Sequence, residues 1–186
     1  MRLTAHGKSS SQPLIIKIDP RVKTPQDELT RQFELASRIS ARESEVSAAL
    51  RQIAELQKQL GARKKETSEK SDVAKTLDEL NQKLEAMVAS DGDGGFGLYG
   101  LAFPKKEPGS LTKAASALNG LLNIVESADV APSTDAVTAH EKWDKAAEEA
   151  LARWADFQNK DLANANAMLQ KANLKPVATT ETSAGR

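Results

Sequence analysis

The stretch that decides the fold runs from Thr24 to Leu60 and reads TPQDELTRQFELASRISARESEVSAALRQIAELQKQL. Its first residues are typical of a helix start, because Thr24 can cap the first turn, Pro25 suits the first helical position and Asp27 places negative charge there. Steps of mostly three or four residues separate its apolar side chains, which predicts that they share one face of a single long helix. These side chains are Leu29, Phe33, Ala36, Ile39, Val46, Leu50, Ile53 and Leu60.

The rest of the chain is expected to cover this face, since one helix cannot bury its own apolar stripe. Gly61 is expected to end the first helix. Residues 24–174 are therefore predicted to form a mainly α domain, an antiparallel bundle of four main helices with a short fifth that Asp161 caps. The later helices are predicted at about residues 68–89, 110–128, 133–159 and 161–174.

The fourth of these helices carries both tryptophans. Trp143 and Trp154 are eleven residues apart, about three helical turns, so they are expected to face the same way. They either fill the core or anchor a partner, and the core is the commoner role. The residues expected to face inward on this helix are Val137, His140, Trp143, Ala147, Leu151, Trp154 and either Phe157 or Gln158.

Residues 1–19 are predicted to form a β-hairpin. Alternation of Leu14, Ile16 and Ile18 marks one strand, Arg2–Ala5 is the expected partner, and the polar segment His6–Ser11 is the expected turn. A lone hairpin is marginally stable in water. The hairpin therefore either packs on the helices or is the remnant of an upstream β-sandwich, and the second interpretation is preferred.

Two segments are predicted to lack regular structure. Residues 90–109 contain six glycines and two prolines and are expected to form a long exposed loop. Three aromatic residues in this loop, Phe96, Tyr99 and Phe103, are candidates for docking on a partner surface, with a plain flexible loop as the alternative. Residues 175–186, rich in Thr, Ser, Ala and Gly, are expected to be a disordered tail.

Composition argues against several functions. Lys+Arg and Asp+Glu are balanced at 26 each, so the chain lacks the basic charge of a nucleic-acid binder. The absence of cysteine excludes disulfides and Cys-ligated metal. No apolar run has the length of a signal peptide or a membrane span.

No catalytic residue, cofactor-binding residue or metal ligand is predicted. Asp91-Gly92-Asp93 is similar to the start of a calcium loop, but the twelfth position is Ala102 instead of the required Glu. His140 and Asp144 form a pair four residues apart, which is too few ligands for zinc. The many helix carboxylates are expected to lie on solvated faces, so a glycosidase is the least favoured function.

Several runs resemble the C-terminal region of a family of large exported bacterial proteins. They are QPLIIKIDPRVKTP at 12–25, QFEL at 32–35, GLL at 120–122, APST at 131–134 and LARW at 151–154. The family comprises sortilin-like β-propeller proteins with BNR repeats, often described as glycosyl hydrolases. The resemblance covers about residues 1–175, and no propeller blade motif is present in this chain.

The resemblance implies that residues 12–25 join a β-sandwich to a terminal helical bundle, in an exported parent protein. It predicts a non-catalytic structural or interaction module whose partner is an upstream propeller or β-sandwich. The alternative is a free-standing helical adaptor that binds another protein or forms a homodimer. No catalytic residue of the family can be placed in this chain, because its propeller is absent.

Overall fold

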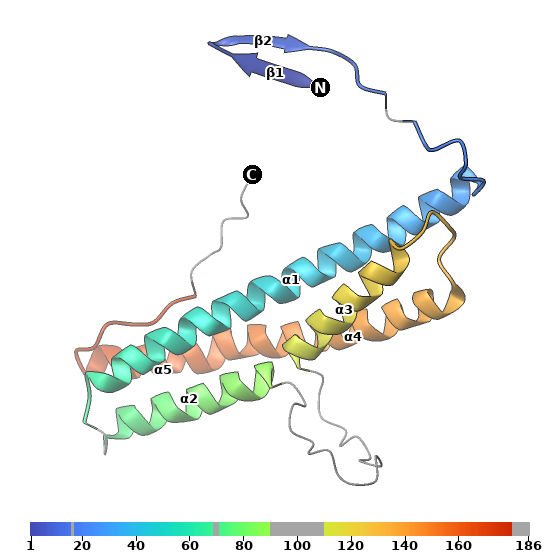
Figure 1. Cartoon of the computed structure of the whole chain (residues 1–186). Coiled ribbons are helices and arrows are strands. Elements are labelled where there is room, and N and C mark those ends of the chain that lie inside the picture. Colours follow the sequence, from blue (N-terminus) through green and yellow to red (C-terminus); the bar gives the residue numbers. More distant parts are fainter. Residues whose placement is uncertain (16, 69–70, 90–109, 180–186) are drawn as a thin grey trace.

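The computed structural model describes residues 1–15, 17–68, 71–89 and 110–179. In this part of the chain an N-terminal two-stranded hairpin precedes a helical bundle, so the predicted mainly α fold class is confirmed (Figure 1). The elements in chain order are β1 (Arg2–Ala5), β2 (Lys8–Ser11), α1 (Gln26–Lys65), α2 (Asp72–Val88), α3 (Leu111–Val125), α4 (Thr134–Asp156), the π-helical segment η1 (Phe157–Leu162) and α5 (Ala163–Lys171).

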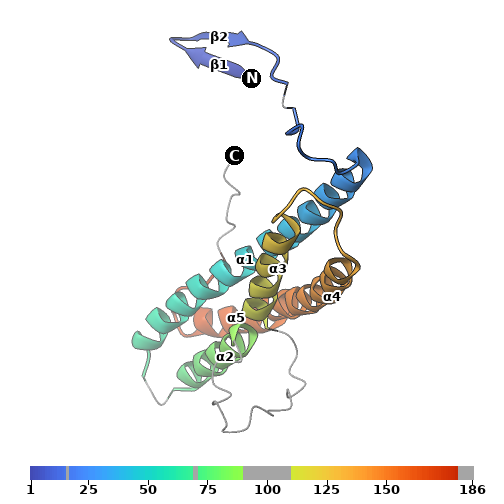
Figure 2. The ribbon, with the colours of Figure 1, turned by 45° about the vertical axis from the view of Figure 1, so that its right-hand side comes forward.

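The long helix α1 forms the axis of the bundle, and its 40 residues span about 60 Å. Helix α2 packs antiparallel along its C-terminal half, where Lys64 pairs with Asp78. Helix α3 packs along its N-terminal half, and the α2 and α3 ends meet where Thr112 donates to the carbonyl of Val88 at 2.8 Å. Helix α4, η1 and α5 then run back alongside (Figures 1 and 2).

One continuous core joins both halves of the bundle. It extends from Leu35 on α1 through Leu84 on α2 and Leu118 on α3 to Leu169 on α5. The apolar face of α1 is therefore covered within the same chain. No helix among the described residues is long and apolar enough to cross a membrane.

Serine side chains set the starts of α2, α3 and α4. In each case the hydroxyl accepts a backbone N–H bond from the third residue that follows, as an N-cap residue does. The predicted cap of α1 is wrong, because Pro25 occupies the N-cap position and the Thr24 hydroxyl instead donates to the carbonyl of Asp129. The capping serines are Ser71, Ser110 and Ser133.

Helix α1 also continues beyond its predicted end. Gly61 lies within the helix, which extends to Lys65. The last turn is basic, and its residues Arg63 and Lys64 pair with Glu66 and Asp78. Positive charge at the C-terminal end of a helix is favourable, so this turn offsets the cost of a helical glycine.

Two residues predicted to face the core are exposed. Phe33 on α1 is 72% exposed and Val137 on α4 is 40% exposed. Steps of three residues fall short of a full turn by about 60°, so two such steps carry Phe33 about 120° away from Ile39. Leu35 takes the core position instead, at 2% exposure.

The predicted break before the fifth helix is absent, and Asp161 does not cap it. Helix α4 runs into α5 through η1, which begins at Phe157. Buried Phe157 and Leu162 are five residues apart, a spacing that an α-helix would place on different faces. The wider π-helical turn absorbs the extra residue, so both side chains face the core.

The hairpin forms, but with a different second strand from the one predicted. Strand β1 pairs antiparallel with Lys8–Ser11, so that Arg2 faces Ser11, and the segment of Leu14 and Ile18 lies beyond it. His6 and Gly7 form the two-residue turn with φ of 48° and 77°. Positive φ at both positions is typical of the type I′ turn that suits the twist of paired strands.

Part of the predicted disordered tail is ordered. Val177 is 1% exposed and belongs to the core, so the prediction is wrong for the segment around it. The remainder of that tail, residues 180–186, lies outside the described residues, as does the glycine-rich segment 90–109.

Candidate functional site

The N-terminal arm, defined as residues 1–23, is the most exposed part of the described chain. Every residue of β1 and β2 is exposed, and the hairpin stands clear of the bundle in two views (Figures 1 and 2). Backbone bonds hold it, together with two side-chain bonds at Ser9, a hydroxyl pair with Thr4 at 2.8 Å and a bond from Arg2 at 3.2 Å. The arm therefore has no hydrophobic core of its own.

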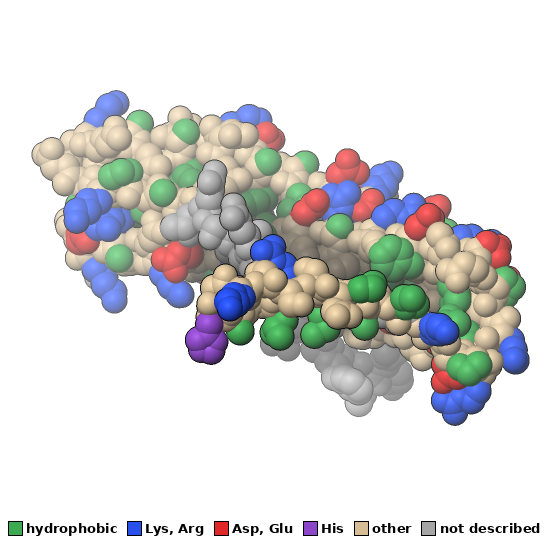
Figure 3. Space-filling view, turned by 90° about the horizontal axis from the view of Figure 1, so that it is seen from above, with side chains coloured by type: hydrophobic (Ala, Val, Ile, Leu, Met, Phe, Trp, Pro, Cys, Tyr) green, Lys and Arg blue, Asp and Glu red, His purple; other side chains and the backbone are tan. Residues whose placement is uncertain are grey.

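Apolar side chains are nevertheless concentrated on this arm. Their exposed fractions are 64% for Leu3, 65% for Leu14, 78% for Ile15 and 51% for Ile18. Figure 3 shows hydrophobic side chains along the arm where it passes in front of the bundle. Four large apolar side chains exposed within sixteen residues form a patch of the kind that marks an interaction surface.

A fixed turn joins the arm to the bundle. The Arg21 guanidinium contacts Asp19 at 2.7 Å, and the backbone N–H of Val22 donates to the carbonyl of Asp19. Hydrogen bonds from the Arg21 side chain and then from its backbone lower the pKa of Asp19. This ion pair is exposed to solvent, and the Thr24 hydroxyl then donates to the carbonyl of Asp129 in the α3–α4 turn.

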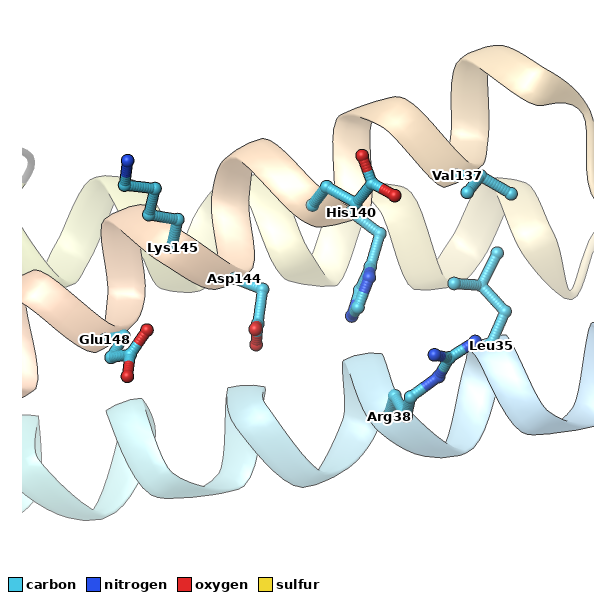
Figure 4. A pocket seen from close by; sticks show the side chains of 8 residues that line it. Leu35, Arg38, Val137, His140, Asp144, Lys145 and Glu148 are labelled. Atoms are coloured by element: carbon cyan, nitrogen blue, oxygen red, sulfur yellow. The ribbon is translucent and has the colours of Figure 1, made fainter.

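A surface pocket of about 400 Å³ lies between α1 and α4 (Figure 4). Its volume falls in the range of small-ligand sites. It contains both acidic and basic side chains. The lining residues are Leu35, Arg38, Val137, His140, Glu141, Asp144, Lys145 and Glu148.

The acidic residues of this pocket all come from α4. Glu141, Asp144 and Glu148 are spaced three and four residues apart, so they form one wall, whereas α1 contributes Leu35 and Arg38. Glycoside hydrolysis needs two carboxylates on opposite sides of the scissile bond. The pocket does not present that arrangement.

An ion pair engages the central carboxylate of this wall. Arg42 on α1 donates to Asp144 at 2.6 Å and to Glu45 at 2.9 Å. The hydrogen bond to Asp144 raises the pKa of the Arg42 guanidinium, so this residue stays charged. The pair links α1 to α4 and accounts for Asp144 in structural terms.

His140 is the least explained residue of the pocket. It is 8% exposed and points from α4 toward α1 (Figure 4). Its Nε2 atom is buried without a hydrogen-bond partner in the described part of the chain. Among the described residues, no group of three or more His, Asp or Glu side chains is placed to hold a metal ion.

The two tryptophans have packing roles. Trp154 is 4% exposed, stacks on Phe157 with ring centroids 5.7 Å apart, and donates to the side chain of Gln52 at 3.2 Å. Trp143 is half-buried at the edge of the core, with Lys142 over its ring at 5.4 Å. The predicted core role is thus confirmed for Trp154 and holds in part for Trp143.

The predicted docking residues Phe96, Tyr99 and Phe103 lie outside the described residues, so their role stays a prediction. Sequence reasoning did not single out the arm as a site, although the alternating apolar residues at 14–18 were the available signal. Comparisons with protein-family models, curated proteins and solved structures find no match for this chain.

Proposed function

We propose that this chain is a non-catalytic interaction module, in which the helical bundle presents the N-terminal arm to a β-sheet of a partner protein. The observation that carries the proposal is the exposed apolar arm, with Ile15 at 78% exposure, beside a bundle with a continuous core of its own. An extended apolar segment next to an open two-stranded hairpin suits strand addition, because main-chain groups can pair with a sheet edge while alternate side chains fill pockets.

The resemblance to sortilin-like propeller proteins indicates which partner to expect. In that family the equivalent junction follows a β-sandwich, so the partner proposed is a β-sandwich or propeller domain. The hairpin stands apart from the helices, which favours this reading over a self-contained adaptor. A homodimer is the second candidate function, because the arm of a second copy can cover the same apolar side chains.

Site-specific photocrosslinking tests this proposal. A photoreactive amino acid is placed at Ile15 in the full chain, and in a matched control at Glu79, which is exposed on α2. Crosslinking in cells of the source organism is expected to yield an adduct with a β-rich protein from position 15 only. The double variant Leu14→Asp/Ile18→Asp is expected to abolish that adduct, since it places charge in the apolar contact.

Two outcomes would count against the leading proposal. Equal adducts from positions 15 and 79 would indicate nonspecific contact and refute it. An adduct only between two copies of the chain would replace the β-domain partner with the homodimer.

A further inference from the structure

The segment after α5 turns back onto the bundle through a specific helix C-cap. Asn173 has a φ of 56°, its N–H donates to Gln170 at 3.1 Å, and the N–H of Leu174 donates to Leu169 at 2.9 Å. These two bonds define a Schellman motif with Asn in the left-handed position. Pro176 favours an extended backbone at this point, and residues 177–179 bind side chains of α5, η1 and the C-terminal half of α1.

Two side-chain amides hold the backbone of this segment. Asn166 on α5 donates to the carbonyl of Val177 and accepts from its N–H, both at 2.8 Å. Gln59 on α1 makes the same pair of bonds with Ala178, both at 3.0 Å. Two consecutive residues thus have both backbone groups satisfied by side chains of the bundle, an arrangement we call the amide clamp.

Only one side chain of the segment is buried. Val177 is 1% exposed and fills a site in the core, whereas Pro176 and Ala178 on either side of it are exposed. The Thr179 hydroxyl accepts a further bond from Gln158 at 3.3 Å. The bundle therefore binds an extended backbone together with a single small β-branched anchor at this site.

We infer that this surface of α1, η1 and α5 is a peptide-recognition site, and that residues 177–179 are its intramolecular ligand. The partner it fits is an extended segment of another protein, with Val at the anchor followed by a small residue. Backbone pairing by the amide clamp is independent of sequence, so selectivity comes from the Val177 site alone. The resident segment is held by one buried side chain and five hydrogen bonds, and its short tether gives it an effective concentration in the millimolar range against competitors.

The test uses the full chain with its own segment displaced. Val177→Asp places a charge in the apolar site and is expected to release the segment. The probe is a fluorescent heptapeptide with the sequence of residues 173–179, Asn-Leu-Lys-Pro-Val-Ala-Thr, followed by anisotropy. We expect saturable binding to the Val177→Asp chain and at least tenfold weaker binding to the wild-type chain, whose own segment competes.

Matched controls separate recognition from nonspecific adsorption. The same heptapeptide with aspartate in place of valine should not bind, and Asn166→Ala in the Val177→Asp background should weaken binding at least tenfold. Absence of saturable binding to a Val177→Asp chain of native helix content would overturn the inference. If that variant loses its helix content, the full-length Val177→Ala chain replaces it and is judged by the same criterion.

The oligomeric state provides a further check. A wild-type dimer in sedimentation that Val177→Asp converts to a monomer would show that the segment exchanges between two copies. That result would overturn the assignment of this site to a segment of a different protein.

Discussion

Val177 is six residues beyond the end of α5, yet its side chain is 1% exposed. Val177→Ala removes two buried methyl groups and should lower the free energy of unfolding by about 1–3 kcal/mol. Urea unfolding followed by circular dichroism measures this change. Val130→Ala is the matched control, since Val130 is 54% exposed and its truncation should change stability by less than about 0.5 kcal/mol. Equal effects of the two substitutions would contradict the packing of Val177.

His140 poses a different problem at the residue scale, because its buried Nε2 lacks a partner among the described residues. An unsatisfied buried polar atom costs stability, and an apolar side chain of similar size avoids that cost. His140→Leu should therefore leave the free energy of unfolding unchanged or raise it by up to about 1 kcal/mol. Thermal and urea unfolding of this variant, beside His140→Ala, would decide the matter. A large loss of stability in the leucine variant would indicate that the imidazole has a polar partner.

Among the secondary-structure elements, the C-cap of α5 controls where the following chain goes. Asn173 adopts a left-handed conformation, which glycine adopts freely and β-branched residues resist. Asn173→Val should destabilise the fold by about 1–2 kcal/mol. It should also speed amide exchange at Val177 and Ala178, because the segment would leave the amide clamp.

Asn173→Gly is the control for this prediction. It should retain the stability of the wild-type chain to within about 0.5 kcal/mol and keep both amides protected. Fast exchange at Val177 in the glycine variant would show that the cap does not position the segment.

Helix periodicity made the main helices predictable from sequence, whereas strand pairing and turns were harder to predict. The positions of α2 and α3 follow closely from the predicted ranges 68–89 and 110–128. The second strand was misplaced because alternation at Leu14–Ile18 is a stronger pattern than the polar Lys8–Ser11 segment. Strand pairing there depends on the two-residue turn at His6-Gly7, a signal of backbone geometry and not of hydrophobicity.

The candidate sites were harder to predict than the fold. The amide clamp joins Gln59 to Ala178, more than a hundred positions later in the chain, and the burial of Val177 depends on the same packing. A single sequence carries no signal of such contacts. The π-helical segment was missed for a related reason. Asp161 can cap a helix and therefore predicted a break, while the five-residue step between Phe157 and Leu162 fits neither helix nor strand periodicity and gave no signal of a continuous helix.

On the scale of the whole molecule, the bundle and the arm differ in how far each buries its own apolar side chains. The bundle buries the face of α1 along both halves, with a continuous core and an Arg42–Asp144 ion pair between α1 and α4. The arm exposes Leu3, Leu14, Ile15 and Ile18. This contrast is the basis for proposing that the bundle is a scaffold and the arm is the binding element.

Amide hydrogen exchange on the full chain tests this contrast most directly, first alone and then with the β-rich protein captured through Ile15. Alone, the core amides of α1, α3 and α4 should exchange slowly, while those of residues 2–19 should exchange nearly as fast as in an unfolded chain. In the complex, residues 13–19 should become protected and the bundle should remain unchanged. Slow exchange of the arm in the isolated monomer, or an arm that stays unprotected in the complex, would contradict the proposed function.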